Sequence, residues 1–192
     1  RRRDILRQFL AEAVTLSLLG GIMGVALGLG GAGLAAYFLG LPFVPSTGVI
    51  ALALLFSGYT PCADVCPGPM ANIAAALHKL PDAVARQVTV VFVTTDPERD
   101  TPDRIRAWLD HFDPRFIGLT GTQAEVDSAQ VAMHLPLAYR EEIPGAPYQV
   151  GHSAHVIAFT KDGMARFALP FGTRQSEWAQ EIPRLVAYPG QP

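Results

Sequence analysis

Two cysteines, Cys62 and Cys66, lie four residues apart in the segment GYTPCADVCPG and are the only cysteines of the chain. Turn-forming residues surround them, and helical spacing begins at Pro67, so both thiols belong to a loop and the first turn of a predicted helix. A pair so placed can form a disulfide, bind a soft metal ion, or stay inert. Because the start of a helix lowers the pKa of a thiol, the placement favours one of the two reactive roles.

The donor set restricts which metal ion the pair could hold. Zinc sites usually take four ligands, and the sequence has neither a second cysteine pair nor a His-x-x-x-His motif. Cu(I) is soft, prefers thiolate ligands and accepts a low coordination number, so two cysteines and one histidine would suit it. The histidine has to come from elsewhere in the chain.

The chain has five histidines, namely His78, His111, His134, His152 and His155. His78 and His111 lie near the ends of predicted helices, where a solvated or capping role is expected, and His134 has no informative spacing. His152 and His155 begin a predicted strand, and residues three apart in a strand point to opposite faces. Only one of the two can therefore face the cysteine loop, and His152, at the strand entrance, is the better candidate.

The elements that position these residues alternate between strands and helices. VIALALLF, residues 49–56, is a short apolar run that ends in turn residues, as a buried central strand does. The predicted strands are 49–56, 88–95, 116–119, 137–140, 152–159 and 164–168, and the predicted helices are 67–80, 101–112, 125–133 and 176–186. This order predicts an α/β sandwich with a mixed sheet. A cysteine pair after the first central strand favours a thioredoxin-like fold.

The segment DPERDTP, residues 96–102, joins a predicted strand to a predicted helix. Either Asp100 or Thr101 can cap that helix, with Pro102 in its first turn. We therefore expect a structural role for this segment and assign it no catalysis.

The N-terminal part differs in composition from the rest of the chain. No charged residue occurs between Glu12 and Asp64, and the apolar run from Ala13 to Leu39 exceeds the roughly 20 residues that cross a bilayer as a helix. The alternatives are a buried soluble helix or a cleaved signal peptide, whose apolar region is shorter and precedes a small-residue cleavage site. We predict a transmembrane helix within an N-terminal region, residues 1–47, followed by a folded domain over residues 48–192.

The charges predict an orientation and exclude one class of partner. Arg1, Arg2, Arg3 and Arg7 precede the apolar run, which favours a cytoplasmic N-terminus and places the folded domain outside the cytoplasm. A cysteine pair can persist there as a disulfide. After residue 47 the chain has 15 Asp and Glu against 11 Lys and Arg, so the folded domain lacks the basic surface that nucleic-acid binding requires.

Several motifs resemble those of the SCO/SenC family in order and spacing. They are GYTPCADVCP, VVFVTTDPERDTP, FDPRFIGLTGT, GHSAHVIAF and FGT at residues 171–173, and the resemblance spans residues 49–186. Members of this family are membrane-anchored copper chaperones of thioredoxin fold that help to assemble the copper site of cytochrome c oxidase. The resemblance implies that Cys62, Cys66 and His152 bind a copper ion, as Cu(I) or Cu(II).

Two departures from the family pattern lie next to the implied ligands. The family usually has His before and Pro after its first cysteine, where this chain has Pro61 and Ala63. It usually has an Asp before the ligand histidine, where this chain has Gly151. That change removes a carboxylate that could orient the imidazole. We expect the three ligands to be kept and the copper affinity or redox behaviour to differ.

The N-terminal region resembles a different family. RRRDILRQFLAEAVTLSLLGGIMGVALGLG and the apolar stretches after it are similar to the C-terminal membrane region of FtsX/MacB-type ABC transporter permeases. The resemblance changes to SCO/SenC near Ser57 and Gly58, and the usual leading strands of the chaperone are missing. We expect a fused or truncated reading frame with its junction at this point.

We expect a copper chaperone tethered to the bacterial inner membrane, with its thioredoxin-like domain on the periplasmic side. Its expected partner is a copper-bearing subunit of cytochrome c oxidase or another copper carrier. One alternative is an enzyme, a thiol-disulfide reductase of a copper-binding partner, in which Cys62 attacks and Cys66 resolves the mixed disulfide. Another is a fragment of a transporter permease fused to a passenger domain.

Overall fold

The computed structural model describes residues 51–190, together with Ser17, Gly20, Gly21, Met23, Gly24, Leu27 and Gly28. The chain divides into two units, Arg1–Thr47 and Gly48–Pro192. In the first unit, the described residues are helical and exposed. Among the described residues, no helix has the length and apolar character needed to cross a membrane. Most of the predicted span from Ala13 to Leu39 and of the permease-like segment lies outside them.

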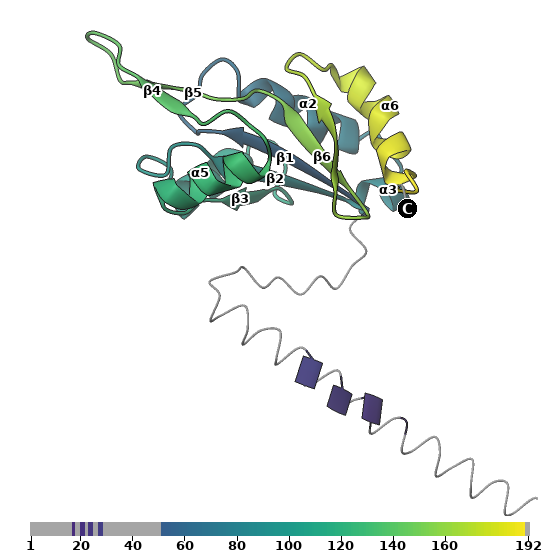
Figure 1. Ribbon diagram of the computed structural model, residues 1–192. Coiled ribbons are helices and arrows are strands. Elements are labelled where there is room, and N and C mark those ends of the chain that lie inside the picture. The colour runs from purple at the N-terminus through teal and green to yellow at the C-terminus, as the bar shows by residue number, and fades with distance from the viewer. Residues whose placement is uncertain (1–16, 18–19, 22, 25–26, 29–50, 191–192) are drawn as a thin grey trace, which may run out of the picture. The chain divides into compact units, whose positions relative to one another are not determined.

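A five-stranded sheet forms the centre of the second unit, in the order β3-β2-β1-β6-β7 (Figure 1). Its strands are β1 (Leu52–Gly58), β2 (Val88–Thr94), β3 (Ile117–Leu119), β6 (Val156–Thr160) and β7 (Ala165–Leu169). The first three are parallel to one another, whereas β6 and β7 run antiparallel to their neighbours. The sheet is therefore mixed as predicted, and β1 is its central strand, with two strands on either side.

Helices cover this sheet and supply most of the remaining core. They are α2 (Pro67–Leu77), α3 (Asp82–Ala85), α4 (Pro102–Leu109), α5 (Gln123–Ala132) and α6 (Gln175–Val186). Phe56 of β1 and Phe92 of β2 are register partners, and Trp108 of α4 packs on Phe92. Trp178 of α6 is buried in the same core, and Figure 1 shows α6 beside α2, which it contacts. This core holds the start of α2 against the end of β1.

A separate two-stranded sheet follows α5. Its strands, β4 (Tyr139–Glu141) and β5 (Gln149–Gly151), pair antiparallel and, within residues 51–190, form no ladder with the large sheet. Figure 1 shows this ribbon reaching beyond the ends of the large sheet. The prediction that a strand begins at His152 was wrong. Residues 152–155 cross from the ribbon to β6 and pair with neither sheet.

The DPERDTP segment begins at the end of β2 and leads into α4. Thr101 caps α4 as predicted, since its hydroxyl accepts a hydrogen bond from the Arg104 N–H and Pro102 occupies the first turn. Asp100 does not cap the helix. Its carboxylate is buried and faces the cysteine loop instead.

Candidate metal centre

The loop between β1 and α2 carries both cysteines. Cys62 closes a turn by donating its backbone N–H to the carbonyl of Tyr59 at 3.2 Å. Cys66 is the capping residue of α2, and its backbone N–H donates to the sulfur of Cys62 at 3.3 Å. Both side chains are buried free thiols. The start of the helix therefore positions one cysteine and supplies a hydrogen bond to the other.

The end of β1 comes close to the sulfur of Cys66. A Cβ atom on Gly58 would lie 2.8 Å from that sulfur, 3.0 Å from the ring of Phe56 and 3.2 Å from the ring of Phe92. Both rings are fully buried and cannot easily move. Glycine is therefore the residue that leaves room for the sulfur at this position.

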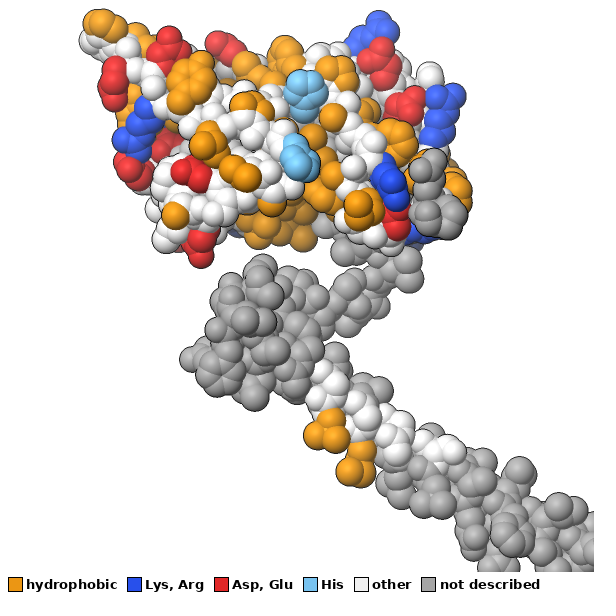
Figure 2. Space-filling model, in the orientation of Figure 1, with side chains coloured by type: hydrophobic (Ala, Val, Ile, Leu, Met, Phe, Trp, Pro, Cys, Tyr) orange, Lys and Arg blue, Asp and Glu red, His pale blue; other side chains and the backbone are white. Residues whose placement is uncertain are grey.

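His152 is the histidine that the structure brings to the cysteines. Its Nε2 lies 3.3 Å from the Sγ of Cys66, and its ring packs edge-on against the rings of Phe56 and Tyr59. His152 is half-buried, whereas the other four histidines are exposed, and Figure 2 shows histidine side chains open to solvent on one face. His155, the alternative weighed from the sequence, is among the exposed ones. The structure thus brings His152, and not His155, to the cysteines, although the strand begins at Val156 and not at His152.

The hydrogen bond on the far side of the His152 ring determines which nitrogen is free. Nδ1 lies 2.9 Å from the backbone carbonyl oxygen of Ser153. A carbonyl oxygen only accepts, so Nδ1 must carry the proton when this bond forms. In the neutral ring, Nε2 then keeps a free lone pair on the side of Cys66. Metal-binding histidines are commonly oriented in this way, with one nitrogen on the metal and the other donating to a carbonyl.

The three side chains form a group that could hold a metal ion. The two sulfurs and a ring nitrogen of His152 all lie within 4.8 Å of one another, and no other such group of His, Cys, Asp or Glu occurs among the described residues. Cys62 and His152 line an open pocket of about 510 Å³, whereas Cys66 does not. A metal ion or a partner would therefore reach the group past Cys62 and His152.

The two thiols differ in acidity. The pKa of Cys62 is lowered from 9.0 to about 4, mainly by a hydrogen bond with Cys66 and further by His152 and by backbone N–H groups, against the effect of burial. The hydrogen bond with Cys62 and burial raise the pKa of Cys66. Cys62 is therefore the more acidic thiol of the pair.

Sequence reasoning missed two buried carboxylates beside the site. Asp96 and Asp100 are 2% and 1% exposed, and Asp100 accepts a hydrogen bond from the backbone of Thr60, two residues before Cys62. The available signal was their position directly after a buried strand. A capping role explained that position equally well.

The residue before His152, Gly151, lies against a side chain of the neighbouring strand. Gly151 and Tyr139 are cross-strand partners in the β4–β5 ribbon. A Cβ atom on Gly151 would lie 2.4 to 2.8 Å from atoms of the Tyr139 side chain. The tyrosine therefore occupies the space that a larger residue at position 151 would need.

Comparison with known proteins agrees with this geometry. A sequence model of the SCO1/SenC family, described as SCO1/SenC, matches residues 50–187. A putative copper-binding protein of Stutzerimonas stutzeri is 34% identical over 113 residues, which are 59% of this chain and 55% of that protein. The structure of Bradyrhizobium japonicum ScoI with copper bound is 30% identical, with a TM-score of 0.63 over 70% of this chain and 84% of that chain.

A more distant structure shows the same fold. BsSco, described as a member of the Sco family of cytochrome c oxidase assembly proteins, is 19% identical, with a TM-score of 0.52 over 72% of this chain and 81% of that chain. These likenesses confirm the predicted thioredoxin-like α/β fold.

The chain spans about half the length of the curated relatives it matches. The predicted junction at Ser57 and Gly58 lies inside β1 and inside the matched range. Since the family match covers residues 50–187, nearly all of the folded unit, the chain belongs to the SCO1/SenC family.

Proposed function

We propose that this chain is a copper chaperone that binds Cu(I) through Cys62, Cys66 and His152 and delivers it to a copper site of cytochrome c oxidase. The observation that carries the proposal is the convergence of two sulfurs and one imidazole nitrogen within 4.8 Å. Two thiolates and an imidazole are donors that Cu(I) prefers. The copper-bound relative from Bradyrhizobium japonicum supports the same metal.

The arrangement of the three ligands suits delivery as well as binding. Cys62 and His152 line the open pocket, so ligands of a partner can replace them first. Cys66 is fully buried and would release the ion last. Exchange of one ligand at a time lets the ion pass to a partner without being set free in solution.

The proposed partner is the copper-bearing subunit of the oxidase, reached from the periplasmic side of the bacterial inner membrane. The apolar run from Ala13 to Leu39 and the arginines before it support a membrane tether with this orientation. Membership of the SCO1/SenC family supports the link to oxidase assembly.

The test is an anaerobic titration of the reduced full chain with Cu(I) against a competing chelator. The wild-type chain should bind one equivalent of Cu(I). The Cys62→Ser and Cys66→Ser variants should compete far less well, because each loses a thiolate ligand. Folded wild-type protein that fails to compete with the chelator would contradict the proposal.

A second candidate function, a thiol-disulfide reductase, is favoured by the difference in acidity between the two thiols. The Cys62 thiolate would attack a disulfide of the partner and release one partner thiolate, which takes up a proton. Cys66 would then give up its proton and attack the mixed disulfide. This step frees the second partner thiol and leaves Cys62 and Cys66 joined. Retention of this activity by a His152→Ala variant that has lost copper binding would favour the reductase.

A further inference from the structure

The DPERDTP segment contacts both parts of the chain that carry the proposed ligands, although none of its side chains belongs to the ligand group. Asp96 begins a turn in which its carbonyl accepts hydrogen bonds from the backbone N–H groups of Arg99 and Asp100. The two side chains that follow, Arg99 and Asp100, reach different partners. Arg99 faces the part of the chain that leads to His152, and Asp100 faces the cysteine loop.

Asp100 holds the cysteine side. Its carboxylate is 1% exposed and accepts hydrogen bonds from the Thr60 backbone N–H at 2.9 Å, the Thr60 hydroxyl at 2.5 Å and the Thr94 hydroxyl at 2.7 Å. Thr60 lies in the turn that the backbone N–H of Cys62 closes. Because a buried carboxylate without donors is costly, these bonds fix the backbone where the cysteine loop begins.

Arg99 and Asp96 hold the histidine side through Tyr148. The guanidinium of Arg99 lies 3.7 Å from the centre of the Tyr148 ring and donates to the Tyr148 carbonyl at 3.0 Å. The Tyr148 hydroxyl donates to the Asp96 carboxylate at 3.0 Å, and Arg99 Nε donates to the same carboxylate. The ring, carbonyl and hydroxyl of Tyr148 are thus all held, directly before the strand that ends next to His152.

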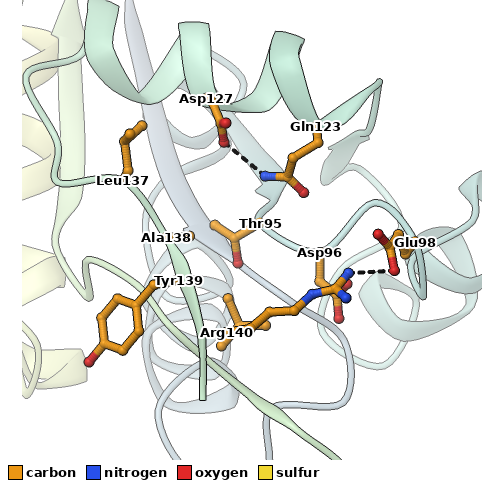
Figure 3. A pocket seen from close by; sticks show the side chains of 10 residues that line it. Thr95, Asp96, Glu98, Gln123, Asp127, Leu137, Ala138, Tyr139 and Arg140 are labelled. Carbon is orange, nitrogen blue, oxygen red and sulfur yellow. Dashed lines mark hydrogen bonds and ion pairs between the residues drawn. The ribbon is translucent and has the colours of Figure 1, made fainter. Parts of the chain in front are cut away.

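A more exposed contact links the same two segments. Figure 3 shows Arg140 of β4 reaching across a pocket to Glu98, and the Arg140 guanidinium also lies 4.5 Å from the centre of the Tyr148 ring. These two side chains are 43% and 66% exposed, so their ion pair contributes little. The side chains of Asp96 and Arg99 are the members of the contact that are shielded from solvent.

These side-chain contacts matter because no backbone ladder joins the β4–β5 ribbon to the large sheet within residues 51–190. On the β6 side, the pairing of β1 with β6 fixes the chain that carries His152. On the ribbon side, the position of His152 relative to the cysteines depends on side chains that bridge the two parts. Tyr59 supplies one bridge by packing on the His152 ring. The DPERDTP segment supplies a second bridge, through its hydrogen bonds to Thr60 and Tyr148.

We propose that Asp100 and Arg99 are positioning residues for the two sides of the site: Asp100 holds the cysteine loop through Thr60, and Arg99 holds His152 through Tyr148. The proposal rests on the proposed function in that it concerns the same copper ligands. Groups that orient metal ligands typically change metal affinity by about 10-fold to 100-fold when they are removed. Both residues act from consecutive positions of one turn, so a single backbone segment sets both sides of the site.

The test is a pair of double-mutant cycles on the full chain, with Cu(I) affinity measured anaerobically by chelator competition. Arg99→Lys keeps the charge but loses the planar fork that reaches Tyr148 and Asp96 together. Asp100→Asn keeps the shape of the side chain, but the amide can accept fewer hydrogen bonds than the carboxylate. Each change is made alone and in a His152→Ala background. Arg86→Lys and Asp103→Asn are the matched controls, because they make the same changes at exposed positions away from the ligands.

Arg99→Lys and Asp100→Asn should each weaken Cu(I) binding by about 10-fold, while both controls leave it unchanged. In the His152→Ala background, Arg99→Lys should cause no further loss of Cu(I) affinity, because no histidine remains to be positioned. Asp100→Asn should lower Cu(I) affinity by the same factor in the His152→Ala background as in the wild type, because it acts on the cysteine loop. Two variants that bind like the wild type, or an Arg99→Lys loss that persists without His152, would overturn the proposal.

Thermal unfolding shows whether each variant keeps its fold. If Asp100→Asn does not fold, Thr60→Val replaces it, because that change removes the hydroxyl donor and leaves the backbone N–H in place. The NMR signals of the His152 ring in the metal-free chain give a readout that is independent of copper. They should shift in Arg99→Lys and stay in place in Arg86→Lys. If the wild type binds no Cu(I) but the His152 signals shift in Arg99→Lys, the proposed function fails and the positioning role stands. If the wild type binds Cu(I) but the signals do not shift, the proposed function stands and the positioning role fails.

Discussion

The Sγ atom of Cys66 lies 3.3 Å from the Nε2 atom of His152, although 86 residues separate them in the chain. One strand pairing brings them together. Cys66 packs against Gly58 at the end of β1, and Phe56 of the same strand pairs with Val156 at the start of β6. The chain just before β6, which carries His152, therefore passes the end of β1 where the cysteine loop begins.

This convergence predicts different outcomes for two histidines that are only three residues apart. His152→Ala should weaken Cu(I) binding by more than about 10-fold, because it removes a donor atom and not merely a supporting group. His155→Ala should leave Cu(I) affinity unchanged, since His155 is exposed and outside the ligand group. Chelator competition on the two variants measures both effects. Equal affinities for the two variants would mean that His152 is not a ligand.

The acidity of Cys62 predicts an unusual pH dependence of thiol alkylation in the reduced, metal-free chain. Because the pKa of Cys62 is lowered to about 4, its thiolate is present above that pH and is lost as the pH falls through it. Iodoacetamide should therefore label Cys62 at pH 6, where an ordinary thiol with a pKa of 9.0 is almost wholly protonated. Cys66, whose pKa is raised, should stay unlabelled.

Mass spectrometry of peptides labelled between pH 3 and pH 9 locates the modified residue and the midpoint of its rate. The same chain unfolded in denaturant is the control, and both cysteines should then react with an ordinary thiol profile. A midpoint near 9 for the folded chain, or earlier labelling of Cys66, would show that the two thiols do not differ in this way.

The limits of prediction from the sequence follow from the range of the interactions involved. The strands at 49–56 and 88–95 were predictable because a strand buried on both faces is a continuous apolar run. Two cysteines at a helix start were recognisable as a reactive pair for an equally local reason. Asp100 and Asp96 were not recognised, because their partners Thr60 and Tyr148 lie 40 and 52 residues away. Hydrogen bonds at such distances leave no periodicity in the sequence.

Close packing at the end of β1 predicts a specific effect of Gly58→Ala. The new methyl group would lie 2.8 Å from the Cys66 sulfur, so the sulfur or the strand must move. Overpacking of this kind typically lowers the free energy of unfolding by about 1 to 3 kcal/mol. It should also weaken Cu(I) binding, because a ligand is displaced. Denaturant unfolding and chelator competition measure the two effects.

Gly68→Ala is the matched control for that change. Gly68 lies in α2, two residues after Cys66, and a Cβ atom there would meet only one atom of Phe171, at 3.9 Å. Alanine should stabilise the helix by up to about 1 kcal/mol and leave Cu(I) affinity unchanged. If Gly58→Ala were as harmless as Gly68→Ala, the contact between β1 and Cys66 would not constrain the site.

The cross-strand pair Gly151 and Tyr139 predicts which side chain an acidic residue before His152 would displace. In Gly151→Asp the new Cβ would lie 2.4 to 2.8 Å from the Tyr139 side chain, so the tyrosine must leave its place over β5. Because Tyr139 is 64% exposed, its ring can turn away into solvent, so we expect the free energy of unfolding to fall by no more than about 1 kcal/mol, through loss of the cross-strand contact. The double variant Tyr139→Ala/Gly151→Asp should be less destabilised than the sum of the two single variants, because the clash is then absent.

Copper binding by these variants separates the effect of the carboxylate from the effect of the clash. With Tyr139 already replaced, Gly151→Asp places a carboxylate next to His152, and a carboxylate beside a ligand histidine raises its basicity and fixes its orientation. The double variant should therefore bind Cu(I) more tightly than Tyr139→Ala alone. If the double variant bound Cu(I) more weakly than Tyr139→Ala alone, the added carboxylate would not be the better orienting group. The Ser153 carbonyl, which already accepts a hydrogen bond from Nδ1 of His152, would then orient the ring better, and Gly151 would leave that bond undisturbed.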